Sequence, residues 1–249
     1  MTGWPAGYGR VIVAEAGSTL DAARQEASTT PMPFWLLAHR QTAARGRRGR
    51  AWTMAEGNFA ATLMLEAREP PHVAALRSFV MALALHRALI AVTGRTLDFA
   101  LKWPNDVLLR GGKVAGILLE SIGQAGRTGP LAIGVGVNLV SAPDPASVEA
   151  GALRPVSLRG ETSVVVTAED FLDALATAYA PLEQQFTQQG FAPIRSAWLA
   201  QAARLGEPIV ARTGREELSG IFEDVQADGS LLLRTQAGAR AIAAADVFF

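Results

Sequence analysis

The sequence contains no cysteine, only three histidines and two tyrosines, and no excess of charge of either sign. Without cysteine the chain forms no disulfide, no cysteine–zinc site and no thiol nucleophile, which fits a reducing cytoplasm. With 23 basic and 23 acidic residues it also lacks the basic excess of a general nucleic-acid coat. Since 49% of the residues are hydrophobic, we expect a globular, cytoplasmic protein with a substantial core.

Signal and membrane-spanning segments are not expected. The chain does not open with a basic segment followed by a long apolar run, as a secretory signal peptide would. The most apolar stretch, Ser78–Val92, is interrupted by His86 and Arg87 and is shorter than the roughly 20 residues that a membrane span needs. A buried helix is the better interpretation, and we predict no membrane association.

Several common site motifs are also missing. There is no G-x-x-x-x-G-K-[S/T] phosphate-binding loop, and GVGVNL (Gly134–Leu139) departs from G-x-G-x-x-G because position 139 is leucine. The histidines, His39, His72 and His86, have no zinc-binding spacing and give little support to a catalytic triad. Nucleotide binding would therefore need a different architecture.

The pattern of elements predicts an α+β fold. The strand candidates are Tyr8–Glu15, Phe34–His39, Asn58–Glu66, Phe99–Trp103, Asp106–Arg110, Lys113–Ser121 and Pro130–Val140, with Gly111-Gly112 as a two-residue hairpin turn. The helix candidates are Leu20–Ala27 capped by Ser18, Val73–Val92 closed by Gly94, Ala168–Gln189 and Ala192–Ala203. Short turns between adjacent strands favour a mixed, largely antiparallel sheet with helices over a regular βαβ alternation.

After Gly206 the pattern changes to short strands separated by glycine turns. The candidates are Pro208–Arg212, Glu217–Glu223, Leu231–Arg234 and Arg240–Ala243. This spacing predicts a small C-terminal β-barrel. We therefore divide the chain into a larger domain, residues 1–203, and a barrel domain, residues 204–249.

The densest charge cluster in this neutral chain is RGRRGR, Arg45–Arg50. A solvated basic loop or an RNA-binding tag would explain an isolated arginine run. This run, however, is single and short, and lies between the buried strand candidate Phe34–His39 and Trp52. Glycines allow a tight backbone, and arginine forks suit phosphate and carboxylate oxygens. We interpret the run as a mobile loop that closes over a polyanionic small molecule.

A second candidate is KWPNDVLL, Lys102–Leu109. Lys102 ends an apolar strand candidate, and the turn that follows is fixed by Pro104 and by Asn105 and Asp106, which can bond their own backbone. A lysine on so rigid a turn suits a preorganised electrostatic role. Glycines at positions 116, 134 and 136 lie inside strand candidates, where they indicate bulges, packing needs or close approach of a ligand.

Taken together, these segments resemble the biotin protein ligases, also called biotin–[acetyl-CoA-carboxylase] ligases. The matching motifs, in order, are Gly17–Thr19, Gln41 to Trp52 around RGRRGR, Gly57-Asn58, Lys102–Val107, Lys113–Glu120 and Gly134–Asn138. Six motifs in register along essentially the whole chain make the resemblance specific. It implies a class II aminoacyl-tRNA-synthetase-like catalytic domain, shared with lipoate ligases, and an SH3-like C-terminal barrel.

The resemblance also implies a two-step reaction. Biotin and MgATP first give biotinyl-5′-AMP and pyrophosphate, and the biotinyl group then passes to a specific lysine of the biotin carboxyl carrier domain of a carboxylase. Because the first strand candidate begins near residue 8, we expect the monofunctional type without an N-terminal DNA-binding domain. No nucleic-acid partner is expected, and the exposed edge of the central sheet allows a homodimer.

The resemblance assigns the catalytic roles to Lys102, which would hold the biotin carboxyl and later the adenylate phosphate, and to Arg47, the loop residue most tied to retaining the adenylate. The residues it assigns to biotin are Ser18, Thr19, Leu20, Gln41, Arg45, Gly46, Arg47, Lys102 and Gly116. Those it assigns to ATP or the adenylate are Arg47, Arg48, Arg50, Trp52, Asn105, Lys113 and Asn138. It assigns no metal ligands, and Mg²⁺ is expected to come with the ATP phosphates.

Two residues depart from the family pattern, and two other functions compete. Leu20 stands where asparagine is usual, leaving only a backbone contribution, and Ala44 where a glycine usually precedes the first loop arginine; we expect activity to persist because neither removes a charge. A lipoate or octanoate ligase of the same fold needs no partners for a ureido ring, so Ser18, Thr19 and Gln41 favour biotin. A nucleic-acid-binding module that uses RGRRGR would leave KWPNDV unexplained and fits poorly with zero net charge.

Overall fold

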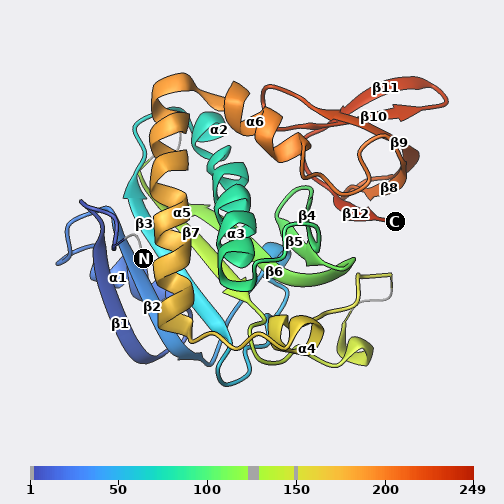
Figure 1. The fold of residues 1–249 in the computed structure, drawn as a ribbon. Coiled ribbons are helices and arrows are strands. Elements are labelled where there is room, and N and C mark those ends of the chain that lie inside the picture. Colours follow the sequence, from blue (N-terminus) through green and yellow to red (C-terminus); the bar gives the residue numbers. More distant parts are fainter. Residues whose placement is uncertain (1–2, 123–128, 149–150) are drawn as a thin grey trace.

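A computed structural model describes residues 3–122, 129–148 and 151–249 (Figure 1). Within them the larger sheet has seven strands in the order β1-β2-β3-β7-β6-β5-β4. Its strands are β1 (Gly9–Ala16), β2 (Phe34–Gln41), β3 (Phe59–Glu66), β4 (Phe99–Lys102), β5 (Asp106–Leu109), β6 (Gly112–Ser121) and β7 (Pro130–Val137). β1 and β2 run parallel and the other neighbours antiparallel, which confirms the predicted mixed sheet.

Helices cover both faces of this sheet because its strands alternate between two apolar sets. Trp35 and Leu37 of β2 join the main core, whereas Phe34 and Leu36 join a smaller cluster with Leu20 of α1. The α-helices of the described residues are α1 (Thr19–Glu26), α2 (Pro71–Ala74), α3 (Arg77–Thr93), α4 (Leu158–Thr162), α5 (Ala168–Gln189) and α6 (Phe191–Leu199). The long helices α3 and α5 lie side by side over one face (Figure 1), and α1 covers part of the other.

The helix predicted over Val73–Val92 is present, but it is divided into α2 and α3. Gly94 closes α3 in the left-handed conformation, and its N–H donates to the carbonyl of Ile90 at 2.7 Å, as expected for a glycine C-cap. By length and composition, Pro71–Thr93 is apolar enough to cross a membrane, yet 72% of its apolar window is buried inside the fold. This burial is what a core helix requires.

The hairpin between β5 and β6 turns at Arg110-Gly111, not at Gly111-Gly112 as predicted. Leu109 pairs with Gly112, so Gly112 already belongs to the strand. Arg110 and Gly111 both have positive φ, 48° and 80°, as a type I′ turn requires. Gly112 is small for a different reason, because a Cβ there would lie 2.4 Å from Cγ1 of Val156.

The second sheet is antiparallel and has the order β11-β10-β9-β8-β12. Its strands are β8 (Pro208–Arg212), β9 (Glu217–Val225), β10 (Leu231–Thr235), β11 (Gly238–Ile242) and β12 (Asp246–Phe248). The four predicted strands are present, and β12 was missed. Only three residues long and preceded by alanines, β12 carries no alternating pattern, and it forms by pairing with β8.

The second sheet packs against the β4 side of the larger one. The indole N–H of the buried Trp103 donates to the carbonyl of Gly229 at 3.0 Å. A Cβ at Gly229 would lie 2.9 Å from Cδ2 of Leu76, so the two parts are in close contact there. Arg195 of α6 also pairs with Asp224 of β9. These contacts bring β12 close to the end of β4, where Lys102 lies.

Candidate functional site

A cavity of about 600 Å³ opens on the α1 face of the larger sheet, within the size range of small-molecule sites. It lies between strands β6 and β7, the segment Ala44–Trp52 and strand β12. Every residue that the resemblance assigned to biotin or ATP lines it except Arg48. Residues from five distant parts of the sequence thus meet in one place.

The segment Ala44–Trp52, here called the arginine loop, folds as a small hairpin. The N–H of Trp52 donates to the carbonyl of Ala44 at 3.0 Å, and that of Gly46 to Arg50 at 2.7 Å. At the tip, Arg48 and Gly49 have positive φ, 56° and 72°. Ala44 does not have positive φ, so alanine in place of the usual glycine imposes no left-handed strain on the backbone.

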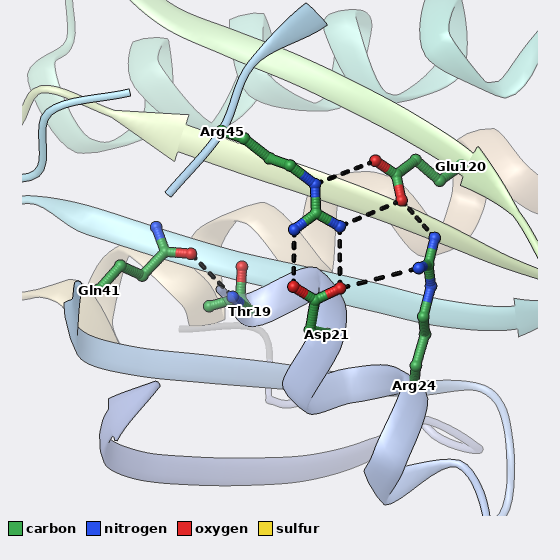
Figure 2. Close-up of polar contacts among 6 residues, drawn as sticks. All are labelled: Thr19, Asp21, Arg24, Gln41, Arg45 and Glu120. Atoms are coloured by element: carbon green, nitrogen blue, oxygen red, sulfur yellow. Dashed lines mark hydrogen bonds and ion pairs between the residues drawn. The ribbon is translucent and has the colours of Figure 1, made fainter. Parts of the chain in front are cut away.

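The base of the arginine loop is fixed by an ion-pair network (Figure 2). The guanidinium of Arg45 donates to both carboxylate oxygens of Asp21, at 2.6 and 2.8 Å, and lies 3.4 Å from Glu120. Arg24 contacts the same two carboxylates. The hydrogen bonds from Arg45 lower the pKa of Asp21, and those to Asp21 and Glu120 raise the pKa of Arg45. The Arg45 side chain is therefore committed to carboxylates of the protein.

The tip of the loop makes a different set of contacts. Arg48 and Arg50 each donate to Oδ2 of Asp246, both at 2.7 Å. Arg47 donates to neutral oxygens, Oδ1 of Asn105 at 3.3 Å and the carbonyl of Ala245 at 3.4 Å. Burial lowers the pKa of Arg47, while the carboxylates of Asp246 and Asp106 oppose that shift. Arg47 is thus a half-buried cation that lines the cavity.

Lys102 ends β4 and lies at the cavity wall with only 11% of its side chain exposed. Its Nζ is 3.9 Å from Oδ2 of Asp106, and Nζ of Lys113 is 2.7 Å from Oδ1 of the same residue. Burial lowers the pKa of Lys102, and the charge of Asp106 opposes this. Asp106 was interpreted from the sequence as a turn residue. Its pairing position opposite Lys102 across β4 and β5 is what makes it part of the site.

The opposite wall of the cavity is neutral. The backbone N–H of Thr19, at the start of α1, donates to Oε1 of Gln41 at 2.8 Å (Figure 2). Ser18 is buried but does not cap α1 with its side chain, contrary to the sequence prediction. Leu20 is buried over β7, where a Cβ at Gly134 would lie 3.1 Å from its Cγ. The leucine thus contributes its side chain to the wall, beyond the backbone contribution expected.

Trp52 packs over two glycines of the sheet and requires one of them. A Cβ at Gly136 would lie 2.7 Å from Cε2 of the Trp52 indole, and one at Gly116 would lie 3.4 Å from Cζ3. Nζ of Lys113 lies 5.6 Å from the ring centroid, within cation–π range. Of the alternatives left open by the sequence, packing of the indole accounts for Gly136.

Two asparagines line the cavity with their amides already engaged. Nδ2 of Asn105 donates to the carbonyl of Ile117 at 2.7 Å, and Nδ2 of Asn138 donates to Val156 at 3.1 Å. These bonds hold the backbone of β6 and of the segment returning past it. In the described part of the chain no group of three or more potential metal-binding side chains occurs, and none of the three histidines lines the cavity.

Sequence comparison places both parts of the chain in known families. Residues 12–138 match the Biotin/lipoate A/B protein ligase family, and residues 205–249 match the Biotin protein ligase C terminal domain. A biotin–[acetyl-CoA-carboxylase] ligase of Paracoccus denitrificans is 56% identical, with 86% of this chain and 90% of the relative covered. The bifunctional ligase/repressor BirA of Bacillus spizizenii is 29% identical over 88% of this chain and 67% of its own.

Solved structures share the fold. The biotin protein ligase from Aquifex aeolicus in complex with biotin and ATP has a TM-score of 0.80 at 24% identity, with 96% of this chain and 98% of that chain covered. The Leishmania major enzyme in complex with biotinyl-5-AMP has a TM-score of 0.64 at 23% identity, over 96% and 100%. These similarities concern the fold. The family is established by the family match, which covers half of the sequence, and by the 56% identity to the Paracoccus enzyme. The chain belongs to the Biotin/lipoate A/B protein ligase family and, within it, to the biotin–[acetyl-CoA-carboxylase] ligases.

Proposed function

We propose that this cavity binds biotin and ATP, forms biotinyl-5′-AMP and passes the biotinyl group to a lysine of a carboxylase carrier domain. The observation that carries the proposal is the division of the cavity. One side presents the cations of Arg47, Lys102 and Lys113, and the other presents the neutral groups of α1 and Gln41. The fused ureido ring of biotin fits the neutral side. The reacting anions, the biotin carboxylate and the ATP phosphates, fit the cationic side.

In the first step, a carboxylate oxygen of biotin attacks the α-phosphorus of ATP. A new P–O bond forms, the bond to the bridging oxygen breaks, and pyrophosphate leaves. Two anions repel each other unless cations lie between them. Lys102 is nine-tenths buried beside Asp106, so its ammonium is held in a defined position and acts in a medium of low dielectric. We assign it to the biotin carboxyl and the α-phosphate.

In the second step, the neutral amine of the carrier lysine attacks the acyl carbon of the mixed anhydride. An amide bond forms, the acyl–oxygen bond breaks, AMP leaves with the bonding electrons, and one proton is released. Water attacking the same carbon would give biotin and AMP instead. We assign the arginine loop to keeping water out when it is closed. We assign Arg47 to the adenylate phosphate, which its contacts with the neutral oxygens of Asn105 and Ala245 support.

Mg²⁺ fits this cavity as an ion carried by the nucleotide. Mg²⁺ is commonly bound by one or two carboxylates together with substrate phosphates. The carboxylates that line the cavity, Asp106 and Asp246, are each paired with basic side chains, and the described residues contain no larger acidic cluster. Bound with ATP, Mg²⁺ would neutralise phosphate charge, with Asp106 as the nearest protein carboxylate to Lys102.

The test is ATP–pyrophosphate exchange, which measures the first step alone. Lys102→Ala should lower the exchange rate by at least about 100-fold, the usual loss when a preorganised charge is removed. Arg234→Ala is the matched control, because it removes an exposed cation that pairs with Glu223 in the second sheet. Near-normal exchange in a folded Lys102→Ala variant would contradict the assignment.

The same assay separates biotin from its chemical rivals. Biotin, lipoate and octanoate are supplied in parallel to the unaltered protein. We expect exchange with biotin to exceed that with either fatty acid, because Thr19 and Gln41 offer polar partners that an alkyl chain does not use. A preference for lipoate or octanoate would overturn the assignment of substrate. The homodimer, the cytoplasmic location and the division at residues 203 and 204 stay predictions.

A further inference from the structure

Asp246 is the residue at which the last strand of the chain meets the arginine loop. It begins β12 and its side chain is only 15% exposed. Its Oδ2 accepts hydrogen bonds from both Arg48 and Arg50, at 2.7 Å each. The carbonyl of the preceding residue, Ala245, accepts from Arg47. Three arginines of the loop therefore reach one short segment of the second sheet.

Burial does little to hold the tip of the loop. The turn Arg47–Gly49 contains no buried residue, so no apolar packing fixes it. Arg48 adopts a left-handed backbone, which costs an ordinary residue about 1 kcal/mol. A conformation that is strained and unpacked persists only when outside contacts favour it. The contacts with Asp246 and Ala245 supply them.

The pairing with Asp246 is stronger than an ordinary surface ion pair. One carboxylate oxygen of this 15% exposed side chain accepts two charged hydrogen bonds, a class roughly twice as strong as neutral ones, from arginines that are 41% and 50% exposed. Although burial alone would raise the pKa of Asp246, the hydrogen bond from Arg50 and the charges of Arg50, Arg48 and Arg47 lower it. The carboxylate is therefore ionised at neutral pH and able to hold the loop.

Residues beyond Asp246 close the cavity on the same side. Val247 and Phe248 line it, and the ring of Phe249 lies 5.6 Å from Nζ of Lys102. The end of the chain is thus in contact with both the loop and the lysine assigned to the reacting groups. A movement of β12 would open the cavity where the adenylate is expected to lie.

We propose that Asp246 is a positioning residue of the reaction, which fastens the closed arginine loop to the C-terminal sheet and so sets how long the adenylate is retained. This inference rests on the proposed function. Asp246 acts through Arg48 and Arg50 and not on the reacting atoms. When the fastening is lost, biotinyl-5′-AMP leaves before transfer, and free amines or water attack its acyl carbon in solution.

The experiment compares formation of the adenylate with its escape. Asp246→Asn, in the full chain, keeps the shape of the side chain and removes its charge. We expect ATP–pyrophosphate exchange within about threefold of the unaltered protein, but at least a tenfold rise in biotin attached to a lysine-rich bystander protein. The bystander is needed because the sequence contains only two lysines, Lys102 and Lys113, both at the cavity, so the protein labels itself poorly.

Asp224→Asn is the matched control. Asp224 also joins the second sheet to the larger domain through an arginine, Arg195 of α6, but it does not contact the loop. It should leave bystander labelling unchanged, and Asp246→Glu should restore part of the retention. Combining Asp246→Asn with Arg48→Gln should add little, because both changes break the same contact.

Each result decides something. Bystander labelling by Asp246→Asn at the unaltered level, or equal labelling by Asp224→Asn, would overturn the role of Asp246. Loss of exchange in Asp246→Asn in a protein that still melts cooperatively would mean that Asp246 acts in the chemical step, and would also overturn it. Absence of biotin-dependent exchange in the unaltered protein would instead refute the proposed function itself.

Discussion

The two ends of the arginine loop are fastened in contrasting ways. At the base, Arg45 binds Asp21 of α1 and Glu120 of β6, in the larger sheet (Figure 2). At the tip, Arg48 and Arg50 bind Asp246, which belongs to the second sheet. Arg47, between them, donates to neutral oxygens. The four arginines of the loop therefore have different roles. Arg45 holds the base, Arg48 and Arg50 hold the tip, and Arg47 is left to serve the cavity. The contacts of the tip depend on how the two sheets pack.

Removing the ion pairs at both the base and the tip of the arginine loop should raise bystander labelling more than any other change. If base and tip act independently, Asp21→Asn combined with Asp246→Asn should raise bystander labelling by the product of the two single effects, since independent contributions add as free energies. Labelling is measured at equal rates of adenylate formation. A double variant no worse than the stronger single one would show that the loop opens as one unit.

Cutting the base alone should impair the reaction next most. Arg45→Met removes the ion pairs that join the loop to Asp21 and Glu120, and leaves Arg24 as the cation beside both carboxylates. We expect kcat/KM for carrier biotinylation to fall about tenfold, equivalent to ~1.4 kcal/mol. Arg10→Met, which breaks an ion pair with Asp173 between β1 and α5, is the control and should change activity little. Equal losses in both variants would refute a specific role of the base.

The glycines of β7 test whether the hairpin also rests on the sheet through Trp52. A Cβ at Gly136 would lie 2.7 Å from the indole, whereas one at Gly134 would lie 3.1 Å from Leu20. Gly136→Ala should therefore displace Trp52 and raise the KM for ATP several-fold, with a smaller change for biotin. Gly134→Ala should instead raise the KM for biotin more than the KM for ATP. Identical changes in both variants would contradict the division of the cavity into a nucleotide side and a biotin side.

Lowering the pH should weaken the ion pairs at both ends of the arginine loop, and we expect this to be the smallest of the effects. The pKa of Asp21 and that of Asp246 are both lowered from the ordinary value of 3.8. A lowered folded-state pKa stabilises the fold above the unfolded value and loses that stabilisation as pH falls through the folded value. Thermal unfolding should thus show no contribution from these carboxylates to pH dependence between pH 7 and about 5, and a loss below about pH 4. The Asp21→Asn, Asp246→Asn double variant should lose less below pH 4; an equal loss would contradict the prediction.

The regular parts of the fold were predictable where local pattern and burial agree. Helix α5 has the predicted bounds, Ala168–Gln189, because its capping threonine and apolar spacing specify both the start and the buried face. The turn between β5 and β6 was misplaced by one residue, since three consecutive residues, Arg110, Gly111 and Gly112, compete for two turn positions. Strand β12 was missed because pairing with β8 forms it, not its own pattern.

The residues of the candidate site were also predictable only in part. Its cations and glycines stand in motifs that the sequence shows directly, and the cavity brings nearly all of them together. Its carboxylates do not stand out. Asp106 and Glu120 stand inside matched motifs but were assigned no ionic role, and Asp21 and Asp246 lie outside the motifs. No spacing rule connects these carboxylates with the basic residues they bind.

The sequence by itself determined the order of the strands and helices along most of the chain, the motifs, and through them the family. Only the tertiary structure decided which charge neutralises which. Arg45 meets Asp21 across 24 positions and Glu120 across 75, and Arg48 meets Asp246 across 198. Contacts over such separations depend on how the sheets and helices pack, because an ion pair needs its two groups within a few ångströms in space.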